Sequence, residues 1–418
     1  MRIIRRVLLL FAAALLLAGA AWSQDKFALK DGDRVVFYGD SITDQRLYTT
    51  FAETYVVTRF PRLKVWFVHS GVGGDRVTGG WAGDIGVRLP RDVIAYKPTV
   101  MTIMLGMNDG SYQGWDEGIF KTYSTGYQHI IDTVKHALPG IRITVIQASP
   151  YDDVTRPPNI DDGYNAVLVR YGQFVKELGE REGLLVADLN APVVSMLEKA
   201  KAEDPELAKD IIKDRVHPGP GGHLIMAEAL LKAWNAPATV AAVEIDAAGG
   251  RVTRSDNAKI TGLKAGSTLS WTETDGALPM PVDMGEKPTA LSVRSSDFIA
   301  ALDQEPLKVT GLSAASYSLT IDGEKVGSFT KDQLKEGINL ATLPTPMAKQ
   351  AAKVHDLTVN HNDIHFARWR EVQISLKDYK LAGEPAVVQA LDKLEDQIVQ
   401  VQRATAKPLL RRYELTPE

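Results

Sequence analysis

The feature that most restricts the fold is an alternation of short apolar runs with helical patterns, from Arg34 to about Trp234. The five runs begin at residues 35, 65, 100, 143 and 184 and read VVFY, VWFV, VMTIML, ITVIQ and LLVA. They are rich in β-branched residues and lack strict alternation, which is typical of strands buried on both faces of a parallel sheet. We therefore expect an α/β fold, in which helices cover both faces of an open parallel sheet.

Helical patterns fill the gaps between these runs, over residues 47–60, 119–138 and 164–182. Proline or glycine follows each of them, which ends a helix for steric reasons. In such folds a ligand binds beyond the carboxyl ends of the strands. Ser41, in the stretch YGDSITDQ, follows the first run and therefore lies where a site is expected.

The first 23 residues have the pattern of a secretory signal peptide, with arginines at positions 2, 5 and 6 followed by an apolar stretch over residues 7–21. The apolar stretch is short for a transmembrane anchor, so we expect cleavage near Ser23. The mature protein is then predicted to be secreted or periplasmic, without a stable membrane anchor.

The charge and the cysteine count exclude several classes of protein. The formal net charge is −4, and it becomes about −7 when the three arginines of the signal segment are removed. A nucleic-acid binder needs a basic excess, so no nucleic-acid partner is expected. The chain has no cysteine, which excludes disulfides, a cysteine nucleophile and cysteine-ligated zinc.

Beyond Pro237 the sequence changes character, so we expect a catalytic domain over residues 24–236 followed by an accessory α+β region. Residues 237–345 hold short strand-like pieces and a hairpin signal at Asp322-Gly323, which predicts a β-rich accessory region. Residues 346–418 read as a helical C-terminal region, in which apolar residues recur at helical spacing from Val387 to Val401. We expect this accessory region to be structural, although it could also bind carbohydrate.

Four stretches that end or follow predicted elements contain what serine acyl chemistry requires. The hydroxyl of Ser41 needs a base, which a histidine provides near neutral pH. That histidine needs a carboxylate to fix its tautomer, and the oxyanion needs preorganised N–H donors. DRVHPGPGGH, residues 214–223, offers the histidine and the carboxylate; HSGVGGDRVTGG, residues 69–80, and GMNDG, residues 106–110, offer the donors.

These blocks resemble those of the SGNH, or GDSL, hydrolase superfamily, and the chain is similar to its secreted bacterial esterases. The GDS block matches Gly39–Ser41, N-x-G-x-x-G-D matches His69–Asp75, G-x-N-D matches Gly106–Asp109, and D-x-x-H matches Asp214–His217. One departure is His69, where asparagine is common. The resemblance implies a flavodoxin-like three-layer α/β/α sandwich with a five-stranded parallel sheet.

The resemblance also assigns roles. It implies that Ser41 is the nucleophile, His217 the base and Asp214 the carboxylate that orients it. It implies that the N–H groups of Ser41 and Gly74 and the amide of Asn108 form the oxyanion hole, with Gly73 as the alternative if the register is off by one. Asp40 and Asp109 are expected to shape the site's loops, and neither a metal nor a cofactor is required.

Other histidines and tryptophans have structural or functional readings. We read His223 as structural. His361 and His365 have the i, i+4 spacing that could bind a metal on a helix, but no third ligand is evident; alternatively the pair could face the active-site cleft. Trp81 and Trp115 follow the second and third blocks, where an aromatic ring could stack on a sugar or serve packing.

The function predicted from these observations is that of a serine esterase, a carboxylic ester hydrolase acting on short-chain acyl esters of a small molecule or polysaccharide. A carbohydrate O-acetylesterase fits export and acidity. The alternatives are an esterase of lipase or lysophospholipase type and, from another class, a non-catalytic carbohydrate-binding protein on the same fold.

Overall fold

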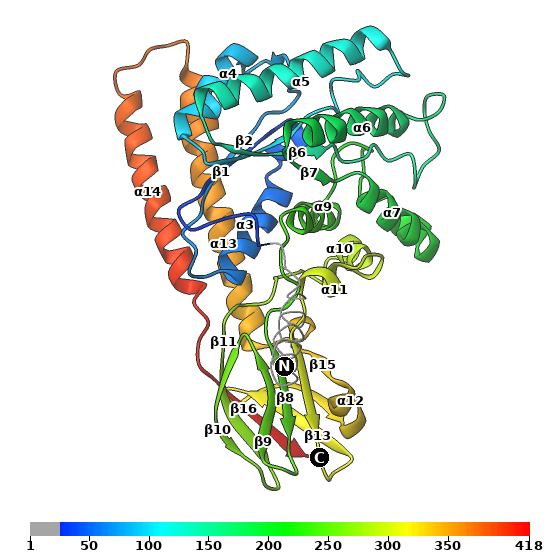
Figure 1. The fold of residues 1–418 in the computed structure, drawn as a ribbon, viewed down its shortest axis with the longest axis vertical. Helices are drawn as coiled ribbons and strands as arrows, with labels where there is room; N and C mark the ends of the chain where they lie inside the picture. The colour runs from blue at the N-terminus through cyan, green and yellow to red at the C-terminus, as the bar shows by residue number, and fades with distance from the viewer. Residues whose placement is uncertain (1–25) are drawn as a thin grey trace, which may run out of the picture.

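The structure is a computed structural model that describes residues 26–418. The signal segment, residues 1–23, lies outside the described residues. Two parts stand one above the other in Figure 1: an α/β part that begins at residue 26 and contains the five-stranded parallel sheet, and a smaller β-rich part below it. Within residues 26–418, no helix has an apolar stretch long enough to cross a membrane.

A five-stranded sheet forms the centre of the α/β part, in the order β2-β1-β5-β6-β7, and every pair in it is parallel. Its strands are β1 (Arg34–Gly39), β2 (Trp66–Gly71), β5 (Val100–Met104), β6 (Arg142–Gln147) and β7 (Leu185–Asp188). Each begins within one residue of the start of a predicted run. The central strands β1 and β5 are buried almost throughout, because helices cover both faces of the sheet.

The helices form the outer two layers of a three-layer α/β/α sandwich, which confirms the expected fold class (Figure 1). One layer contains α4 (Ile85–Asp92), α5 (Glu117–Ala137) and α6 (Tyr164–Glu182). The other contains α3 (Leu47–Arg59), α7 (Ala191–Glu203), the short α8 (Pro205–Ala208) and α9 (Pro220–Ala233). Shorter elements are α2 (Ser41–Asp44), β3 (Gly79–Gly80), β4 (Gly83–Asp84) and the 3-10 turn η1 (Ile94–Tyr96).

The β-rich part consists of two sheets around a second core. The first has the order β10-β11-β16-β13-β14 and the second the order β15-β12-β8-β9. Their strands are β8 (Ala242–Asp246), β9 (Arg251–Asp256), β10 (Ala258–Lys264), β11 (Leu269–Asp275), β12 (Pro306–Thr310), β13 (Ser316–Ile321), β14 (Glu324–Thr330), β15 (Ile338–Asn339) and β16 (Arg411–Pro417). Alternate residues of β11 and β13 are buried, so one face of that sheet packs on the core. Helix α12 (Lys331–Glu336) and the turn η2 (Leu340–Thr342) lie between strands of this part, whereas α10 (Lys287–Arg294) and α11 (Phe298–Leu302) pack on α9 of the α/β part.

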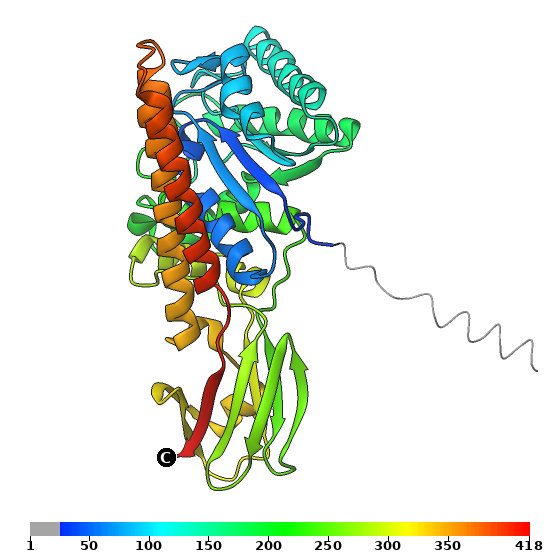
Figure 2. The ribbon, with the colours of Figure 1, turned by 90° about the vertical axis from the view of Figure 1, so that its left-hand side faces the viewer.

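The end of the chain differs from the helical region expected over residues 346–418. Helix α13 (Pro346–Phe366), the π-helix η3 (Ala367–Ile374) and α14 (Glu384–Thr405) are present, but strand β16 follows them. This strand pairs with β11 on one side and β13 on the other, at the centre of its sheet. Figure 2 shows α13 and α14 side by side along the α/β part before the chain returns to the β-rich part.

Helix α13 packs on α3 and on the edge of the parallel sheet at β2. Arg46 donates to the carbonyl of Asn362 (3.0 Å) and pairs with Asp363 (2.8 Å). Asn362 in turn donates to the hydroxyl of Thr50 (2.7 Å). The C-terminal helices are therefore bonded to the α/β part and do not only follow it in the sequence.

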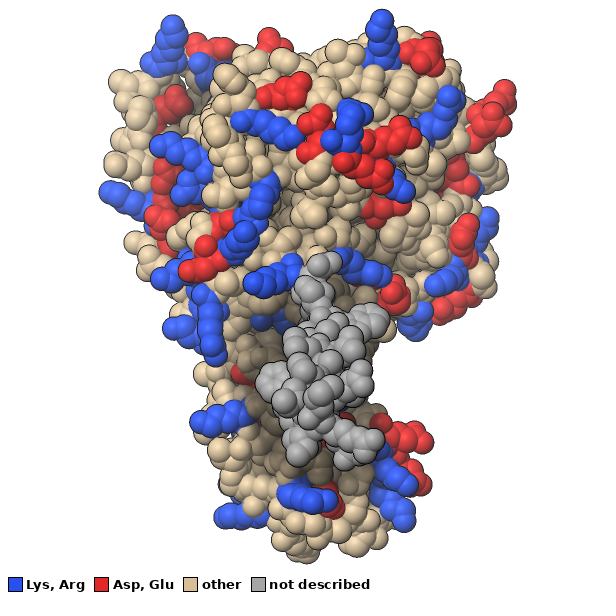
Figure 3. Space-filling view, in the orientation of Figure 1, with Lys and Arg blue, Asp and Glu red and all other residues tan. Residues whose placement is uncertain are grey.

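Basic and acidic side chains are intermixed on the face of the α/β part seen in Figure 3. No region of that face collects one sign of charge, in keeping with the net charge of −4. A nucleic-acid interface would need a clustered basic surface.

Candidate active site

The pairing register brings the first three blocks together at one edge of the sheet. Gly39 at the end of β1 lies opposite Gly71 of β2 and Met104 of β5. The segments that follow these strands therefore begin side by side, at the carboxyl edge where parallel sheets bind ligands.

Ser41 begins the short helix α2, directly after the turn at Gly39 and Asp40. Gly39 is required there, because a Cβ would lie 2.7 Å from the carbonyl oxygen of Met104 and would overlap the side chain of Thr43. Asp40 caps the helix by accepting the N–H of Ile42 (3.1 Å). The sharp turn projects the Ser41 hydroxyl from the sheet edge toward the D-x-x-H segment.

The structure brings Ser41, His217 and Asp214 into one hydrogen-bonded chain. Nε2 of His217 lies 2.8 Å from Oγ of Ser41, and Nδ1 lies 2.6 Å from Oδ2 of Asp214. Both distances are within hydrogen-bond range, so His217 could take the proton of Ser41 while the carboxylate of Asp214 orients the imidazole. The side chain of Asp214 is 55% exposed, so the chain of contacts opens to solvent.

A tight turn presents Asp214 and His217 together. The other oxygen of Asp214 accepts the backbone N–H groups of Val216 (3.0 Å) and His217 (2.8 Å). Arg215, between them, has φ +72°, in the left-handed region. Burial would raise the pKa of Asp214, but the backbone N–H and ring of His217 hold that pKa below its usual value. The carboxylate therefore stays ionised and can stabilise an imidazolium.

His223 and Gln45 support the turn from behind, and His223 has the structural position expected of it. His223 is buried; its Nδ1 accepts the N–H of Tyr48 (3.2 Å) and its Nε2 bonds Gln45 (3.1 Å). Gln45 donates to the carbonyl of Pro218 (3.3 Å), next to His217. Burial lowers the pKa of His223 to about 3, so it is neutral at physiological pH.

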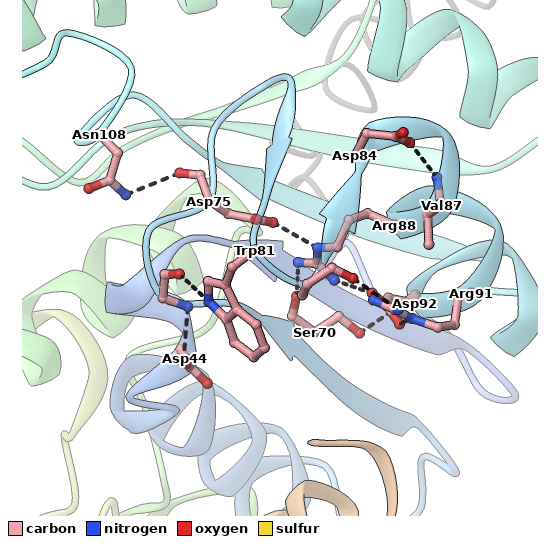
Figure 4. A network of polar contacts seen from close by, with 12 residues as sticks. Asp44, Ser70, Asp75, Trp81, Asp84, Val87, Arg88, Arg91, Asp92 and Asn108 are labelled. Atoms are coloured by element: carbon pink, nitrogen blue, oxygen red, sulfur yellow. Dashed lines mark hydrogen bonds and ion pairs between the residues drawn. The ribbon is translucent and has the colours of Figure 1, made fainter. Parts of the chain in front are cut away.

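The side-chain amide of Asn108 is held by hydrogen bonds at both its nitrogen and its oxygen. Its Nδ2 donates to the carbonyl oxygen of Asp75 (3.0 Å), and its Oδ1 accepts the hydroxyl of Tyr112 (3.0 Å). An amide nitrogen carries two N–H groups, so one remains for an oxyanion. Figure 4 shows Asn108 beside the loop that follows β2.

The register alternative between Gly73 and Gly74 can be compared by their hydrogen bonds. The N–H of Gly73 donates to Oδ2 of Asp44 (3.0 Å) and is occupied. The N–H of Gly74 has no acceptor among residues 26–418, and the space beside its Cα is open. Its φ of +79° favours glycine. These contacts favour Gly74 over Gly73 as a donor.

Asp40 and Asp109 both accept hydrogen bonds from backbone N–H groups. Asp109 accepts the N–H of Val77 (2.9 Å), in the loop that follows Gly74. Burial raises the pKa of Asp40 to about 8 and that of Asp109 to about 7. Below these pH values the groups hold a proton, so they place no full negative charge beside Ser41.

Four residues that contact the loops of the candidate site were not predicted from the sequence. They are Asp44, Tyr112, Trp81 as a hydrogen-bond donor, and Arg370. Asp44 follows Ser41 by one helical turn, and this spacing could have predicted that it lies beside the site. Tyr112 follows Asn108 by four residues, and the left-handed backbone at Ser111 and Tyr112 (φ +56° and +54°) turns its ring back. Arg370 belongs to η3, and no local pattern connects it with the first block.

The histidine pair on α13 does not face the active site. Nδ1 of His361 lies 2.9 Å from Glu53 on α3, and its Nε2 lies 3.1 Å from Glu395 on α14. His365 contacts the same Glu395. Within the described residues no group of three or more ligating side chains is placed to hold a metal ion.

His69, which departs from the family pattern, joins the same buried cluster. Its Nδ1 bonds Thr49 (2.7 Å) and its Nε2 lies 3.3 Å from Glu53. It therefore contributes to packing between β2 and α3 and does not reach Ser41.

The contacts of Trp115 decide between the two roles expected of it. The indole of Trp115 donates to Glu117 (3.1 Å), packs on Phe120 and Tyr171 and is covered by Arg170. Trp115 therefore serves packing.

A cavity of about 180 Å³ lies at the opposite edge of the sheet, where β5 and β6 begin. It is therefore remote from Ser41 and His217.

Comparisons with known proteins show which sequences and structures this chain resembles. Residues 37–225 match the GDSL-like lipase/acylhydrolase family. An acetylxylan esterase of Geobacillus stearothermophilus is 26% identical over 220 residues, which cover 48% of this chain and 93% of the relative. A solved structure of an acetylxylan esterase from that organism is 24% identical, with a TM-score of 0.41, and covers 50% of this chain and 96% of its own.

The chain also resembles, over most of its length, a gut microbial diltiazem-metabolizing enzyme of known structure. It is 27% identical with a TM-score of 0.83, and the match covers 93% of this chain and 98% of that one. The shared architecture thus extends beyond the α/β part to the C-terminal helices and the β-rich part. With the four blocks in order at the edge of a five-stranded parallel sheet, residues 37–225 form a GDSL-like lipase/acylhydrolase domain of the SGNH, or GDSL, type, and the protein is a carboxylic ester hydrolase.

Proposed function

We propose that this protein is a serine esterase that removes short acyl groups, above all acetyl, from carbohydrate esters. The observation that carries the proposal is the chain from Ser41 through His217 to Asp214, at 2.8 and 2.6 Å. The similarity to an acetylxylan esterase supports the acetyl group and the carbohydrate alcohol. An exported enzyme would meet such polysaccharides outside the cytoplasm.

The reaction proceeds in two steps. His217 Nε2 takes the proton of Ser41 Oγ as the oxygen attacks the ester carbonyl carbon. The N–H groups of Ser41 and Gly74 and the amide of Asn108 stabilise the oxyanion. The alcohol leaves with the proton from His217, and Ser41 stays acylated. Water then attacks the acyl-enzyme, again losing its proton to His217, and releases the acid and free Ser41.

The open setting of the site favours a large alcohol. Asp214 is more than half exposed, and Gly73 and Gly74 border Ser41 without side chains: a Cβ on Gly73 would lie 4.0 Å from that of Ser41. A bulky alcohol can therefore approach from solvent while a small acyl group lies near the oxyanion donors.

The first test compares the mature protein with its Ser41→Ala variant on p-nitrophenyl acetate, butyrate and octanoate, on acetylated xylo-oligosaccharides and on diltiazem. Ser124→Ala, a half-exposed serine on α5, is the matched control. The expected result is turnover that favours acetate, falls at least about a thousandfold in Ser41→Ala and is unchanged in the control.

Other outcomes revise the proposal. Preference for octanoate would keep the chemistry and indicate a lipase or lysophospholipase type. Turnover that survives Ser41→Ala would refute the nucleophile. No turnover, together with no labelling of Ser41 by a fluorophosphonate, would indicate a carbohydrate-binding protein.

A further inference from the structure

The peptide between Gly73 and Gly74 is held by an indole. The Nε1–H of Trp81 donates to the carbonyl oxygen of Gly73 at 2.9 Å. That carbonyl belongs to the same peptide unit as the N–H of Gly74. In a trans peptide the two groups point in opposite directions, so the indole contact fixes the direction of the Gly74 N–H.

Such a contact matters more here than at most peptides. Neither Gly73 nor Gly74 has a side chain, and the region beside Gly74 is open. The N–H of Asp75 donates to the carbonyl of Val72 (3.1 Å) and closes a turn around this peptide, but glycine reaches both signs of φ readily, so the central peptide of the turn can still rotate. A rotated peptide would present an oxygen to the oxyanion instead of an N–H.

A guanidinium from the C-terminal region contacts both groups that hold Gly73. The guanidinium of Arg370 lies 4.2 Å from the centre of the Trp81 ring, and its Nη2 lies 3.4 Å from Oδ2 of Asp44. Asp44 accepts the N–H of Gly73 (3.0 Å), whereas Trp81 donates to its carbonyl. Figure 4 shows the Trp81 indole next to Asp44.

The indole depends on these contacts for its position, because Trp81 is 57% exposed. The neighbouring Trp369 anchors η3 to the same loop. Its indole donates to Asp92 (2.7 Å), and its ring is buried against Val72 and Ala82. The segment that carries Arg370 is therefore packed on the loop that carries Gly74.

We propose that Trp81 and Arg370 are positioning residues of the oxyanion hole: the Trp81 indole orients the Gly73–Gly74 peptide, and Arg370 holds the indole. The C-terminal region thus completes the active site of the α/β part. This inference rests on the proposed function, because it assigns the Gly74 N–H to the oxyanion.

The test measures p-nitrophenyl acetate hydrolysis and inhibition by phenylboronic acid, which forms a tetrahedral anionic adduct on a reactive serine. Trp81→Phe keeps the ring but removes the N–H, and Arg370→Ala removes the guanidinium. The matched controls are Trp115→Phe and Arg170→Ala, which alter an equivalent tryptophan–arginine stack with an indole hydrogen bond.

We expect Trp81→Phe to lower kcat/KM about ten- to a hundredfold, somewhat less than the loss of an oxyanion donor. The inhibition constant of the boronic acid should rise by a similar factor, while KM changes less than twofold. Arg370→Ala should lower kcat/KM about three- to tenfold, and Arg370→Lys should recover part of that loss. Both control variants should match the wild type.

Effects of Trp81→Phe no larger than those of Trp115→Phe would overturn the inference, provided that circular dichroism shows both variants folded. An equal loss of substrate hydrolysis with unchanged boronic acid inhibition would overturn it too. Ser41→Ala separates this failure from failure of the proposed function: if that variant stays active, the esterase mechanism itself is wrong.

Discussion

Replacing His361 by glutamine should flatten the pH dependence of stability on the alkaline side. His361 is 2% exposed and lies between the carboxylates of Glu53 and Glu395. Burial alone would lower its pKa, but Glu53 and Glu395 raise it to about 10. Compared with an ordinary value of 6.5, this corresponds to roughly 5 kcal/mol of stabilisation at full effect.

The sign follows from the order of the two pKa values. Below pH 6.5 the imidazole is protonated in both the folded and the unfolded chain, and the stabilisation is fully present. Between pH 6.5 and about 10 only the folded chain keeps the proton, so stability falls as the pH rises. The carboxylate of Glu53 does not titrate in this window, because His361 and His69 hold its pKa at about 2 against the effect of burial.

Urea unfolding at pH 7, 8.5 and 10 measures this effect. The wild type should lose roughly 4 kcal/mol more free energy of unfolding between pH 7 and pH 10 than His361→Gln does. His355→Gln is the matched control on the same helix. His355 bonds the Thr54 hydroxyl (3.0 Å), and burial lowers its pKa, so it is neutral throughout this range.

The control variant should keep the wild-type slope. If wild type and His361→Gln lose the same stability between pH 7 and pH 10, then His361 is neutral in the folded protein and the reasoning is wrong.

Three further substitutions test separate parts of the structure. Tyr112→Phe removes the hydroxyl that donates to Asn108 and should lower kcat/KM for an acetyl ester about three- to tenfold; an unchanged value would show that the amide is held by other contacts. Asp214→Asn should lower kcat by about 10²- to 10⁴-fold with a small change in KM, because the amide favours the wrong tautomer of His217; steady-state kinetics with the acetate ester would contradict this if kcat stayed within tenfold. Tyr413→Ala removes a buried ring from the central strand β16 and should lower the free energy of unfolding in urea by about 3–5 kcal/mol while kcat at 25 °C stays unchanged; a simultaneous loss of kcat would show that the β-rich part supports catalysis.

The parallel sheet was predictable because its strands are buried on both faces and read as continuous apolar runs. The first three blocks follow β1, β2 and β5, whose carboxyl ends pair in register at Gly39, Gly71 and Met104. Their meeting point therefore followed from topology. The D-x-x-H spacing likewise predicted that Asp214 and His217 share one turn.

What escaped prediction depends on contacts between distant parts of the chain. Arg370 and Trp369 belong to no motif, and their partners Asp44 and Asp92 lie more than 270 positions away. Strand β16 was missed because its seven residues follow a long helix and only Tyr413 and Leu415 of it are buried. Local periodicity carries no information on such partners, since tertiary packing decides them.

The hydrogen bond between Glu53 and Gln402, which are 349 positions apart, has a consequence for how one part of the protein could be exchanged without the other. Glu53 also accepts a hydrogen bond from His361, so the α/β part buries a carboxylate whose donors come from the C-terminal helices. A gene fragment ending at residue 236 would remove both donors together with α13, which covers α3, and would leave that face of α3 open to water. The surface of α3 in this protein is thus matched to its C-terminal helices, and exchanging the hydrolase part alone would also require new residues on that face.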